Sequence, residues 1–337
     1  KSLCSILVLI LIVLFLKKYL FSLDLKIILR YLLIISLIST FLIMYSNVNR
    51  PDAGLYHLPY IRIINENKIL IGSSNLHFRF GHISIIQYLS AFFNIHYFST
   101  SSIAIPLSSI LSFFVYFNLK KVFFFLKEKK IDFAIICFFI FLFTIYSFNR
   151  YSGFGNDMPS HIYYFILTIF LLEIKKFKYF GDEFFFKVSL IIIFLFSIKT
   201  FMITTLILLL ILFLLSENKK KILINKKLFI LLFLFLSIIS KNILISGCMI
   251  YPIKISCIDS LGYYDAKKTQ TVAIESEAWS KGWSDQDINK RLDFRDYNKN
   301  FNWISSWSNK HFKQILEKFS PIILIYLIFL GYLNLKR

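Results

Sequence analysis

The amino-acid sequence predicts an all-α, polytopic integral membrane protein. Hydrophobic residues make up 57% of its 337 positions, mean hydropathy is +0.66, and only 17% of the residues are charged. A soluble domain of this length keeps a charged surface around one core, whereas residues 5–16 and 203–215 carry no charge at all. We therefore expect lipid to be the solvent for most of the chain.

The formal net charge of +20 accompanies this hydrophobicity. A basic protein that binds nucleic acid gathers Lys and Arg on a folded soluble face. Here the positive residues lie between apolar runs, where the positive-inside rule places them in membrane proteins. The charge therefore predicts membrane lipid as a partner, and no nucleic acid.

The apolar runs are long enough for about nine crossings, because a membrane helix needs roughly 20 mainly apolar residues, or fewer when its ends snorkel. We predict these helices at residues 3–23, 28–46, 101–119, 131–148, 158–174, 184–198, 201–216, 228–245 and 320–335. The predicted organisation is N-terminal transmembrane helices over 1–46, a first external loop over 47–100, a transmembrane core over 101–245, an external loop or small domain over 246–319, and a C-terminal transmembrane helix over 320–337. The chain starts at Lys1 without Met and stops after one more apolar run, so the sequence leaves open whether it is a fragment.

The connections between the predicted helices fall into two kinds. One kind is short and rich in lysine, with Lys17, Lys18, Lys26 and Arg30, then Lys120, Lys121, Lys127, Lys129 and Lys130, then Lys175, Lys176 and Lys178, and then Lys219 to Lys221 with Lys226 and Lys227. The positive-inside rule predicts that these loops are cytoplasmic. Residues 47–100, 149–160, 199–200 and 246–319 then face the outside, which in a bacterial inner membrane is the periplasm.

Residues 81–98 test this orientation, because they are apolar enough to be taken for a crossing. A crossing there would put the lysines of residues 120–130 on the same side as residues 47–80, against the positive-inside rule. The segment also spans only about 25 Å as a helix, and Gln87, Asn94 and His96 interrupt it. We predict an amphipathic helix that lies in the outer interface.

The first external loop contains the first candidate for catalysis. Asp52 follows the end of a predicted membrane helix and precedes Tyr56 and His57. A carboxylate half out of water in that position is a stronger proton acceptor and suits a general base. The alternative is that Asp52 caps the helix of residues 53–67, since Asp is a preferred N-cap.

The second external turn supplies Arg150, Asn156 and Asp157 shortly before Pro159. A second acid at the same membrane face would position an acceptor or a cation. The alternative is again an N-cap, with Pro159 in the first helical turn.

Lys199 lies in a hairpin between two predicted crossings of about fifteen residues each. So short a hairpin holds the ammonium below the outer surface, where it needs an anionic partner; snorkelling to the interface is the alternative. Arg79 and His77 add a cation and a titratable donor at headgroup depth, where a lipid phosphate would lie.

The order of these features resembles the GT-C superfamily of membrane glycosyltransferases, particularly the bacterial branch with the lipid A aminoarabinose transferases and protein O-mannosyltransferases. The matching motifs are Pro51-Asp52-Ala-Gly-Leu-Tyr56, Gly155-Asn-Asp157-Met-Pro159 and Ser197-Ile-Lys199-Thr-Phe201. The similarity covers residues 47–205. Three features depart from the pattern: Ala53 replaces the second acid of an Asp-Glu pair, an extra helix precedes the first loop, and the later helices are absent or truncated.

The resemblance implies an inverting transfer of a hexosyl or pentosyl group from a polyprenyl-phosphate sugar to a hydroxyl of a lipid, glycan or protein at the outer face. It implies that Asp52 and Asp157 are catalytic and that Lys199 and Arg79 bind the donor phosphate. Tyr56, His57, His77, Arg150 and Asn156 are then expected to contact substrate. Because the Glu is missing, we predict no metal ion, although Asp52 with His57 leaves a divalent cation open.

The stretch 246–319 carries Trp279, Trp283, Trp303 and Trp307 among charges of both signs. These rings could stack on sugars in an acceptor-binding lid, or rest on the membrane interface. Cys248 and Cys257 share the oxidising side, so they either pair or remain thiols. Cys4 and Cys137 lie within predicted helices and are expected to be packing residues.

Absent motifs narrow the field. The sequence has no Walker-type Gly-x-x-x-x-Gly-Lys, no Gly-x-Gly-x-x-Gly, no His-Glu-x-x-His and no Cys-x-x-Cys. Two other functions stay open, a flippase or transporter of lipid-linked glycans and a glycan polymerase. A transporter usually places polar residues near the midplane and shows repeated halves, whereas here the polar residues collect at one face.

Overall fold

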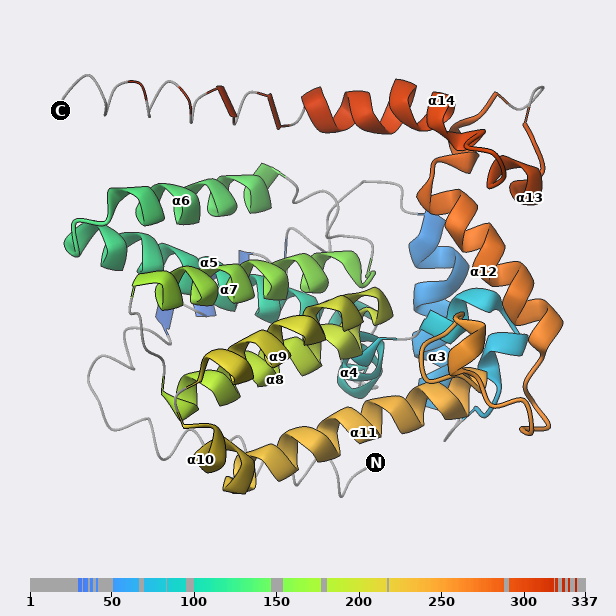
Figure 1. Cartoon of the computed structure of the whole chain (residues 1–337), viewed down its shortest axis with the longest axis horizontal. Coiled ribbons are helices and arrows are strands. Elements are labelled where there is room, and N and C mark those ends of the chain that lie inside the picture. Colours follow the sequence, from blue (N-terminus) through green and yellow to red (C-terminus); the bar gives the residue numbers. More distant parts are fainter. Residues whose placement is uncertain are drawn as a thin grey trace. The chain divides into compact units, whose positions relative to one another are not determined.

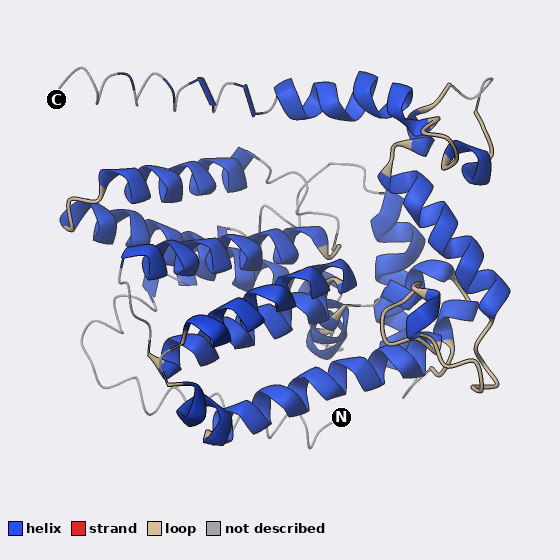
Figure 2. Cartoon of the chain, viewed as in Figure 1, coloured by secondary structure: helices blue, strands red, loops and turns tan. Residues whose placement is uncertain are grey.

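A computed structural model describes residues 30–31, 33–35, 37–38, 41, 51–66, 70–82, 84–94, 100–146, 154–176, 181–216, 218–287, 291–317, 319–320, 323–324, 327 and 331. Within these residues the regular structure is helical and includes no strand (Figure 2). The predicted all-α class is confirmed at this level. The chain divides into two compact units, residues 1–241 and 242–337.

The helices of the first unit follow one another with short connections (Figure 1). Their bounds are α3 (Leu58–Glu66), α4 (Ile85–Phe93), α5 (Ile105–Lys127), α6 (Ile131–Tyr146), α7 (Asp157–Lys176), α8 (Asp182–Ile198), α9 (Leu206–Leu215), α10 (Lys219–Ile224) and α11 (Lys226–Ser246), the last of which runs into the second unit. Short turns of π or 3-10 helix precede several of them: η1 (Ala53–His57), η2 (Ser73–Asn75), η3 (Phe78–His82), η4 (Thr100–Ala104) and η6 (Thr200–Thr205).

The helices of this unit pack in chain order. Helix α5 packs against α6 and α7, α7 against α8, and α8 against α9 (Figure 1). One buried cluster joins Phe114 of α5, Met158 and Ile162 of α7, Ile198 of α8 and Ile86 of α4. The start of α7, the end of α8 and the start of α4 therefore meet in one core, and this contact positions the candidate site.

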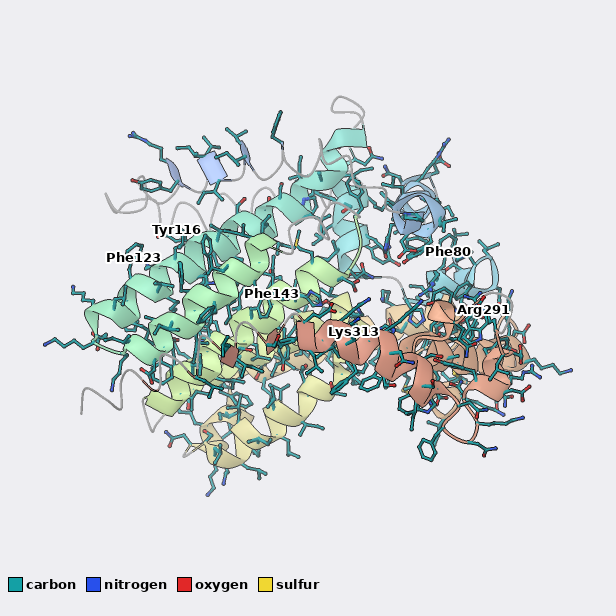
Figure 3. All side chains as sticks on the ribbon, turned by 90° about the horizontal axis from the view of Figure 1, so that it is seen from above. Phe80, Tyr116, Phe123, Phe143, Arg291 and Lys313 are labelled. Carbon is teal, nitrogen blue, oxygen red and sulfur yellow. A yellow bond between two sulfur atoms is a disulfide. The ribbon has the colours of Figure 1, made fainter. Side chains whose placement is uncertain are left out.

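Among the described residues, two helical stretches are long and apolar enough to cross a membrane by length and composition, Ser102–Lys127 and Lys226–Ser246. Two shorter apolar helices cover Ile131–Ile145 and Thr200–Leu215. Large apolar side chains also project from the bundle, among them Phe123, which is 69% exposed (Figure 3). Exposed apolar side chains in such number indicate a membrane environment. Of the predicted crossings, 3–23 lies outside the described residues, and 28–46 and 320–335 lie only partly within them.

Helix α5 is longer than predicted. The sequence indicated a helix over 101–119 followed by a lysine-rich loop, whereas α5 continues to Lys127 and only residues 128–130 form the turn to α6. The loop assignment of Lys120, Lys121 and Lys127 is therefore wrong. The physical reason is that the Lys121 ammonium pairs with Glu173 of α7 and lies over the Phe117 ring, so its charge is accommodated within the bundle.

The segment 81–98 forms a shorter helix than expected. Helix α4 has nine residues, about 14 Å, and is too short to cross a membrane. A capping box fixes its start: the Ser84 hydroxyl accepts from the Ile86 N–H, and the Gln87 side chain accepts from the Ser84 N–H.

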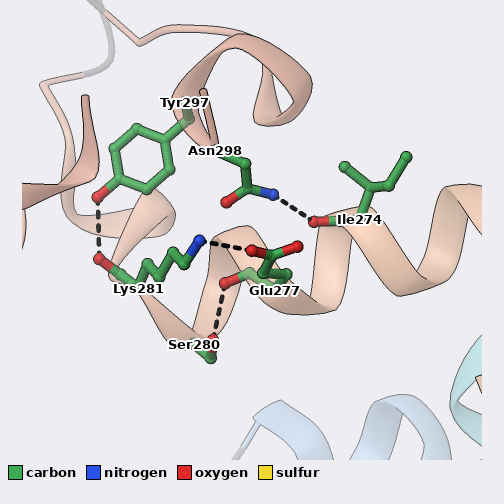
Figure 4. Close-up of polar contacts among 6 residues, drawn as sticks. All are labelled: Ile274, Glu277, Ser280, Lys281, Tyr297 and Asn298. Carbon is green, nitrogen blue, oxygen red and sulfur yellow. Dashed lines mark hydrogen bonds and ion pairs between the residues drawn. The ribbon is translucent and has the colours of Figure 1, made fainter. Parts of the chain in front are cut away.

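The second unit holds α12 (Ala266–Ser280), α13 (Phe294–Tyr297) and α14 (Trp303–Trp307). Cys248 and Cys257 form a disulfide, so of the two alternatives pairing is the one observed. The Tyr297 hydroxyl donates to the Lys281 carbonyl, and the Asn298 amide donates to the Ile274 carbonyl, each at 2.9 Å (Figure 4). These bonds tie α13 to α12.

The tryptophans of this unit pack on one another in two pairs. The ring centroids of Trp279 and Trp283 are 5.9 Å apart, and those of Trp303 and Trp307 are 6.1 Å apart. The arrangement keeps both predicted roles open, sugar stacking and contact with the membrane interface.

Candidate functional site

Asp52 is helical, and the helical turn that follows it has an unusual hydrogen-bond pattern. The Leu58 N–H donates to the Ala53 carbonyl, five residues back, so η1 is a π-helical turn. Turns of this kind are frequent at functional sites because they re-aim side chains. This one brings the rings of Tyr56 and His57 to a centroid distance of 4.2 Å.

The capping interpretation of Asp52 is wrong. Its φ of −58° and ψ of −31° are helical, and its side chain makes no capping bond. Pro51 is helical as well, which leaves Asp52 inside the helix. The side chain of Asp52 is exposed.

His57 is buried at the centre of the cluster. Its Nδ1 lies 2.8 Å from the Gln87 side-chain nitrogen, and a Cβ on Gly155 would lie 3.0 Å from its Nε2. The pKa of His57 is lowered to about 4, mainly by burial; the negative charges of Asp52 and Asp157 oppose this in part, and the positive charge of Arg79 contributes a smaller lowering. The imidazole is therefore neutral at physiological pH and presents one donor and one acceptor.

Tyr56 connects His57 to the cationic side of the cluster. The Arg79 guanidinium lies over the Tyr56 ring at 5.6 Å from its centroid. Burial raises the pKa of Tyr56 above its ordinary value, and the charge of Asp52 and hydrogen bonding to its carboxylate raise it further; Arg79 opposes them, and Asp157 adds a smaller rise. Tyr56 is therefore a neutral hydroxyl within reach of both acids and of Arg79.

The second and third predicted motifs meet directly. The Lys199 ammonium lies 2.6 Å from the Asp157 carboxylate, so the anionic partner expected for Lys199 is Asp157. Asp157 is the first residue of α7, where the helix dipole stabilises a carboxylate. Lys199 is the C-cap of α8, so the ion pair joins the start of α7 to the end of the neighbouring α8.

Asn156, and not Asp157, holds the capping position of α7, because its carbonyl accepts from the Ser160 N–H at 3.2 Å. The N-cap interpretation of Asp157 is therefore wrong by one residue. The side-chain oxygen of Asn156 is buried and has no hydrogen-bond partner within the described ranges. A buried acceptor without a partner is destabilising by about 1–3 kcal/mol, so a donor from a bound ligand would be stabilising there.

Arg79 and His77 belong to the short stretch around η3. The His77 ring stacks on Phe78 with centroids 4.9 Å apart, and its Nδ1 accepts from the Arg79 N–H at 3.2 Å. Burial, and then the charge of Arg79, lower the pKa of His77. In the part of the chain that the structure describes, Arg79 makes cation–π contacts to Tyr56 and Phe78 but no ion pair.

Three residues of this region were not predicted as site residues. Gln87 holds His57; His82 follows Arg79 by three residues; and Lys241 of α11 acts on His82, whose pKa is lowered to about 4 by burial and then by the charges of Arg79, Lys199 and Lys241. A signal for Lys241 was available, because it is the single charged residue between Leu228 and Ser246. Gln87 was noticed only as an interruption of an apolar segment.

Arg150 lies outside the described residues, so its place relative to the cluster is not given. Among the described residues, no group of three or more His, Cys, Asp or Glu side chains is placed to hold a metal ion. The remaining predicted residues gather in two connected halves. Asp52, Tyr56, His57, His77 and Arg79 form the first, and Asn156, Asp157 and Lys199 form the second.

This arrangement combines proton acceptors with cations at one end of the helical bundle. Asp52 is an exposed carboxylate beside two neutral donors, Tyr56 and His57. Arg79 supplies positive charge over the Tyr56 ring, and Lys199 supplies it beside Asp157. Such a pairing of a base with anion-binding groups can deprotonate a hydroxyl and stabilise an anionic leaving group.

Comparison with known proteins yields one match. A family model described as "Domain of unknown function (DUF8201)" matches residues 2–337, which is nearly the whole chain. No curated protein and no solved structure matches the chain.

Proposed function

The chain belongs to the family described as "Domain of unknown function (DUF8201)", and we propose that it is a membrane glycosyltransferase of the GT-C type. In this proposal it moves a sugar from a polyprenyl-phosphate donor to a hydroxyl of a lipid, glycan or protein acceptor. The single observation that carries the proposal is the convergence of Asp52, Asp157 and Lys199. The Asp157–Lys199 ion pair is 2.6 Å long, and the charges of both acids act on Tyr56 and His57.

The proposed setting is a bacterial inner membrane crossed about nine times, with the cluster at the periplasmic face. Its support is the pair of long apolar helices and the apolar exposed surface of the bundle. Lysine-rich segments at one end of the helices, away from the cluster, give the orientation. Helix α4 lies in the outer interface, since nine residues are too few to cross.

In the proposed reaction Asp52 accepts the proton of the acceptor hydroxyl. The resulting oxygen attacks the anomeric carbon from the face opposite the phosphate, and the bond from that carbon to the phosphate oxygen breaks. The polyprenyl phosphate leaves with the electron pair, and the configuration at the anomeric carbon inverts. An exposed carboxylate that makes no capping bond suits this role, because acceptor can reach it.

The cations of the cluster hold the leaving phosphate in this proposal. Arg79 makes no ion pair within the described residues, and its planar guanidinium suits bidentate phosphate binding. Lys199 is the second cation, and Asp157 holds it in place until donor enters. We assign no step to a metal ion.

The acceptor is oriented by the neutral polar groups. The Asn156 side-chain oxygen can accept a hydrogen bond from a sugar hydroxyl. Neutral Tyr56, His57 and His77 can donate or accept. Arg150 is included on the resemblance alone.

The decisive experiment compares wild-type protein with Asp52→Asn in lipid nanodiscs. Each is incubated with candidate polyprenyl-phosphate sugars and acceptors, and released polyprenyl phosphate is measured. Because a general base contributes about 10²–10⁴-fold, we expect Asp52→Asn to lose roughly a hundredfold or more in rate. The control is Glu66→Gln, an exposed acid that pairs with Arg62 on α3 and should keep full activity.

Undiminished transfer by Asp52→Asn at normal expression would contradict the role of Asp52. Flux of intact lipid-linked sugar across vesicles, with no cleavage by any variant, would replace the transferase by a flippase. A product that grows by repeated addition to a lipid-linked chain would indicate the polymerase.

A further inference from the structure

Lys241 is a charged residue in an otherwise apolar membrane-type helix. Between Leu228 and Ser246, α11 carries no other charge. A charged side chain within such a span is unfavourable by several kcal/mol or more, so its retention points to a function. The question is what this ammonium meets at the end of the helix opposite the lysines of residues 219–227.

The packing of α11 places Lys241 beside the candidate site. Leu231 of α11 is buried in the cluster built around α8, and the rings of Phe235 and Phe196 have centroids 5.7 Å apart. Lys241 follows Phe235 by six residues, or about 9 Å, in the direction in which α8 runs from Phe196 to its end. The two lysines, Lys241 on α11 and Lys199 on α8, therefore approach the same end of the bundle.

The third and fourth groups come from η3. Side chains three residues apart in a 3-10 helix eclipse one another, so Arg79 and His82 share a face. His82 leads directly into α4, whose Ile86 is buried against Ile198, the neighbour of Lys199. The positive charges of Arg79, Lys199 and Lys241 all act on the His82 imidazole, which agrees with this placement.

We propose that Lys241 and His82 complete, with Arg79 and Lys199, one anion pocket that binds the phosphate of a polyprenyl phosphate. Lys241 projects from within an apolar helix, a depth that suits a phosphate attached to a lipid tail. His82 presents a neutral donor, and the three cations present charge to the phosphate oxygens. This inference rests on the proposed function and deepens it by naming two further residues, Lys241 and His82, that bind the donor phosphate.

The test measures binding without transfer. Wild type, Lys241→Met and Lys241→Arg are placed in uncharged phosphatidylcholine nanodiscs, and binding of undecaprenyl phosphate is titrated by native mass spectrometry. A charge-assisted hydrogen bond is worth about 1.5–3 kcal/mol, so we expect Lys241→Met to weaken binding roughly 10- to 100-fold, and Lys241→Arg to stay close to wild type. Lys187→Met, which removes an exposed lysine near the start of α8, is the matched control and should bind like wild type.

Two further arms identify the source of the phosphate. Phosphatidic acid carries its phosphate on a different lipid tail, and inorganic phosphate has no tail. Both are expected to bind more weakly than undecaprenyl phosphate. Equal binding of either, or wild-type binding by Lys241→Met, would overturn the inference. A thermal-unfolding scan of Lys241→Met in the same nanodiscs shows whether it remains folded, and Lys241→Gln replaces it if it does not.

This result is separable from the proposed function. If Lys241→Met loses undecaprenyl phosphate binding while no sugar transfer occurs with any donor, the pocket stands and the transferase does not. If transfer depends on Asp52 while Lys241→Met binds and transfers like wild type, the transferase stands and the pocket does not.

Discussion

His57 links the two halves of the candidate site through its contacts and its electrostatic interactions. Its Nδ1 lies 2.8 Å from the Gln87 side-chain nitrogen, a Cβ added at Gly155 would lie 3.0 Å from its Nε2, and both acids act on it electrostatically. Its neighbour Tyr56 carries the contact on to Arg79. Changes that displace or charge this imidazole should therefore alter the whole cluster.

The first prediction concerns the space beside His57. In Gly155→Ala the new Cβ would lie 3.0 Å from the His57 Nε2, closer than ordinary van der Waals contact, so the imidazole must shift. Misplacement of a positioning group by about 1 Å can reduce the rate roughly a hundredfold. We expect a loss of between tenfold and about a hundredfold in transfer, with the protein still folded. Gly181→Ala is the control, because nothing lies within 4 Å of its Cβ; equal activity of both variants would show that the imidazole tolerates the shift.

The second prediction follows from the protonation of His57. Its pKa of about 4 in the folded protein lies below the ordinary 6.5, so folding favours the neutral form. The corresponding stability, on the order of 3 kcal/mol, is present above pH 6.5 and is lost as the pH falls from 6.5 to 4. His57→Asn keeps an acceptor near the Nδ1 position but cannot take up a proton. Thermal unfolding in nanodiscs between pH 7 and pH 4 should therefore show a smaller loss of stability for His57→Asn than for wild type, and identical curves would contradict the assignment.

The sequence identified the residues with suitable chemistry better than it identified the partners that surround them. Asp52, Asp157 and Lys199 could be selected because acids and a lysine at the ends of apolar runs are conspicuous. The pairing of Lys199 with Asp157 depends on how α7 and α8 pack, which no local pattern contains. Lys241 was missed because an isolated lysine in an apolar run was treated as part of a crossing.

Helix α4 is the element that positions His57. Gln87 has two functions there: its side-chain oxygen accepts from the Ser84 N–H, and its side-chain nitrogen contacts His57. Ser84 caps the same helix but does not contact His57. Substitutions at Ser84 and at Gln87 can therefore distinguish the effect of α4 stability from the effect of the contact between Gln87 and His57.

The third prediction uses this pair. Loss of either half of the capping box should lower the free energy of unfolding by about 1 kcal/mol, so Ser84→Ala and Gln87→Ala should be similarly destabilised. Only Gln87→Ala also releases His57, so only this variant should show a further drop in transfer rate, about tenfold. The measurements are thermal unfolding and initial rates on the same preparations. Equal rates for the two variants would mean that the contact between Gln87 and His57 does not matter for the reaction.

The elements themselves were predictable where periodic and apolar patterns decide them. The cores of α6, α8 and α11 fall within two residues of the expected ranges. The end of α5 lies well beyond the expected range. The pairing of Lys121 with Glu173 of α7 lets this helix continue through lysines that were predicted to form a loop. The π-helical turn after Asp52 also has no local signature, since residues 53–57 contain no helix breaker other than Gly54.

The distribution of charge over the whole molecule decides where the site lies. Positive residues gather around the connections α5–α6, α7–α8 and α9–α11, whereas Asp52, Asp157 and the Lys199 hairpin belong to the opposite ends of these helices. The positive-inside rule therefore predicts that the cluster lies on the outer face, as the proposed function requires. This prediction is independent of the chemistry proposed for Asp52.

The fourth prediction tests that orientation. Alkaline phosphatase is active only outside the cytoplasm, and green fluorescent protein folds best within it, so fusions at defined positions report the side of each loop. We expect active phosphatase after Leu76 and Gly262, and fluorescence after Glu128 and Asn225, because the last two positions lie among the lysine-rich connections.

The fusion after Leu76 is decisive, since it lies between Asp52 and α4. Fluorescence there would mean that residues 81–98 contribute a crossing, which nine helical residues in α4 are too few to provide, or that the N-terminal helices cross an odd number of times. In either case Asp52 would face the cytoplasm, on the opposite side of the membrane from the proposed donor.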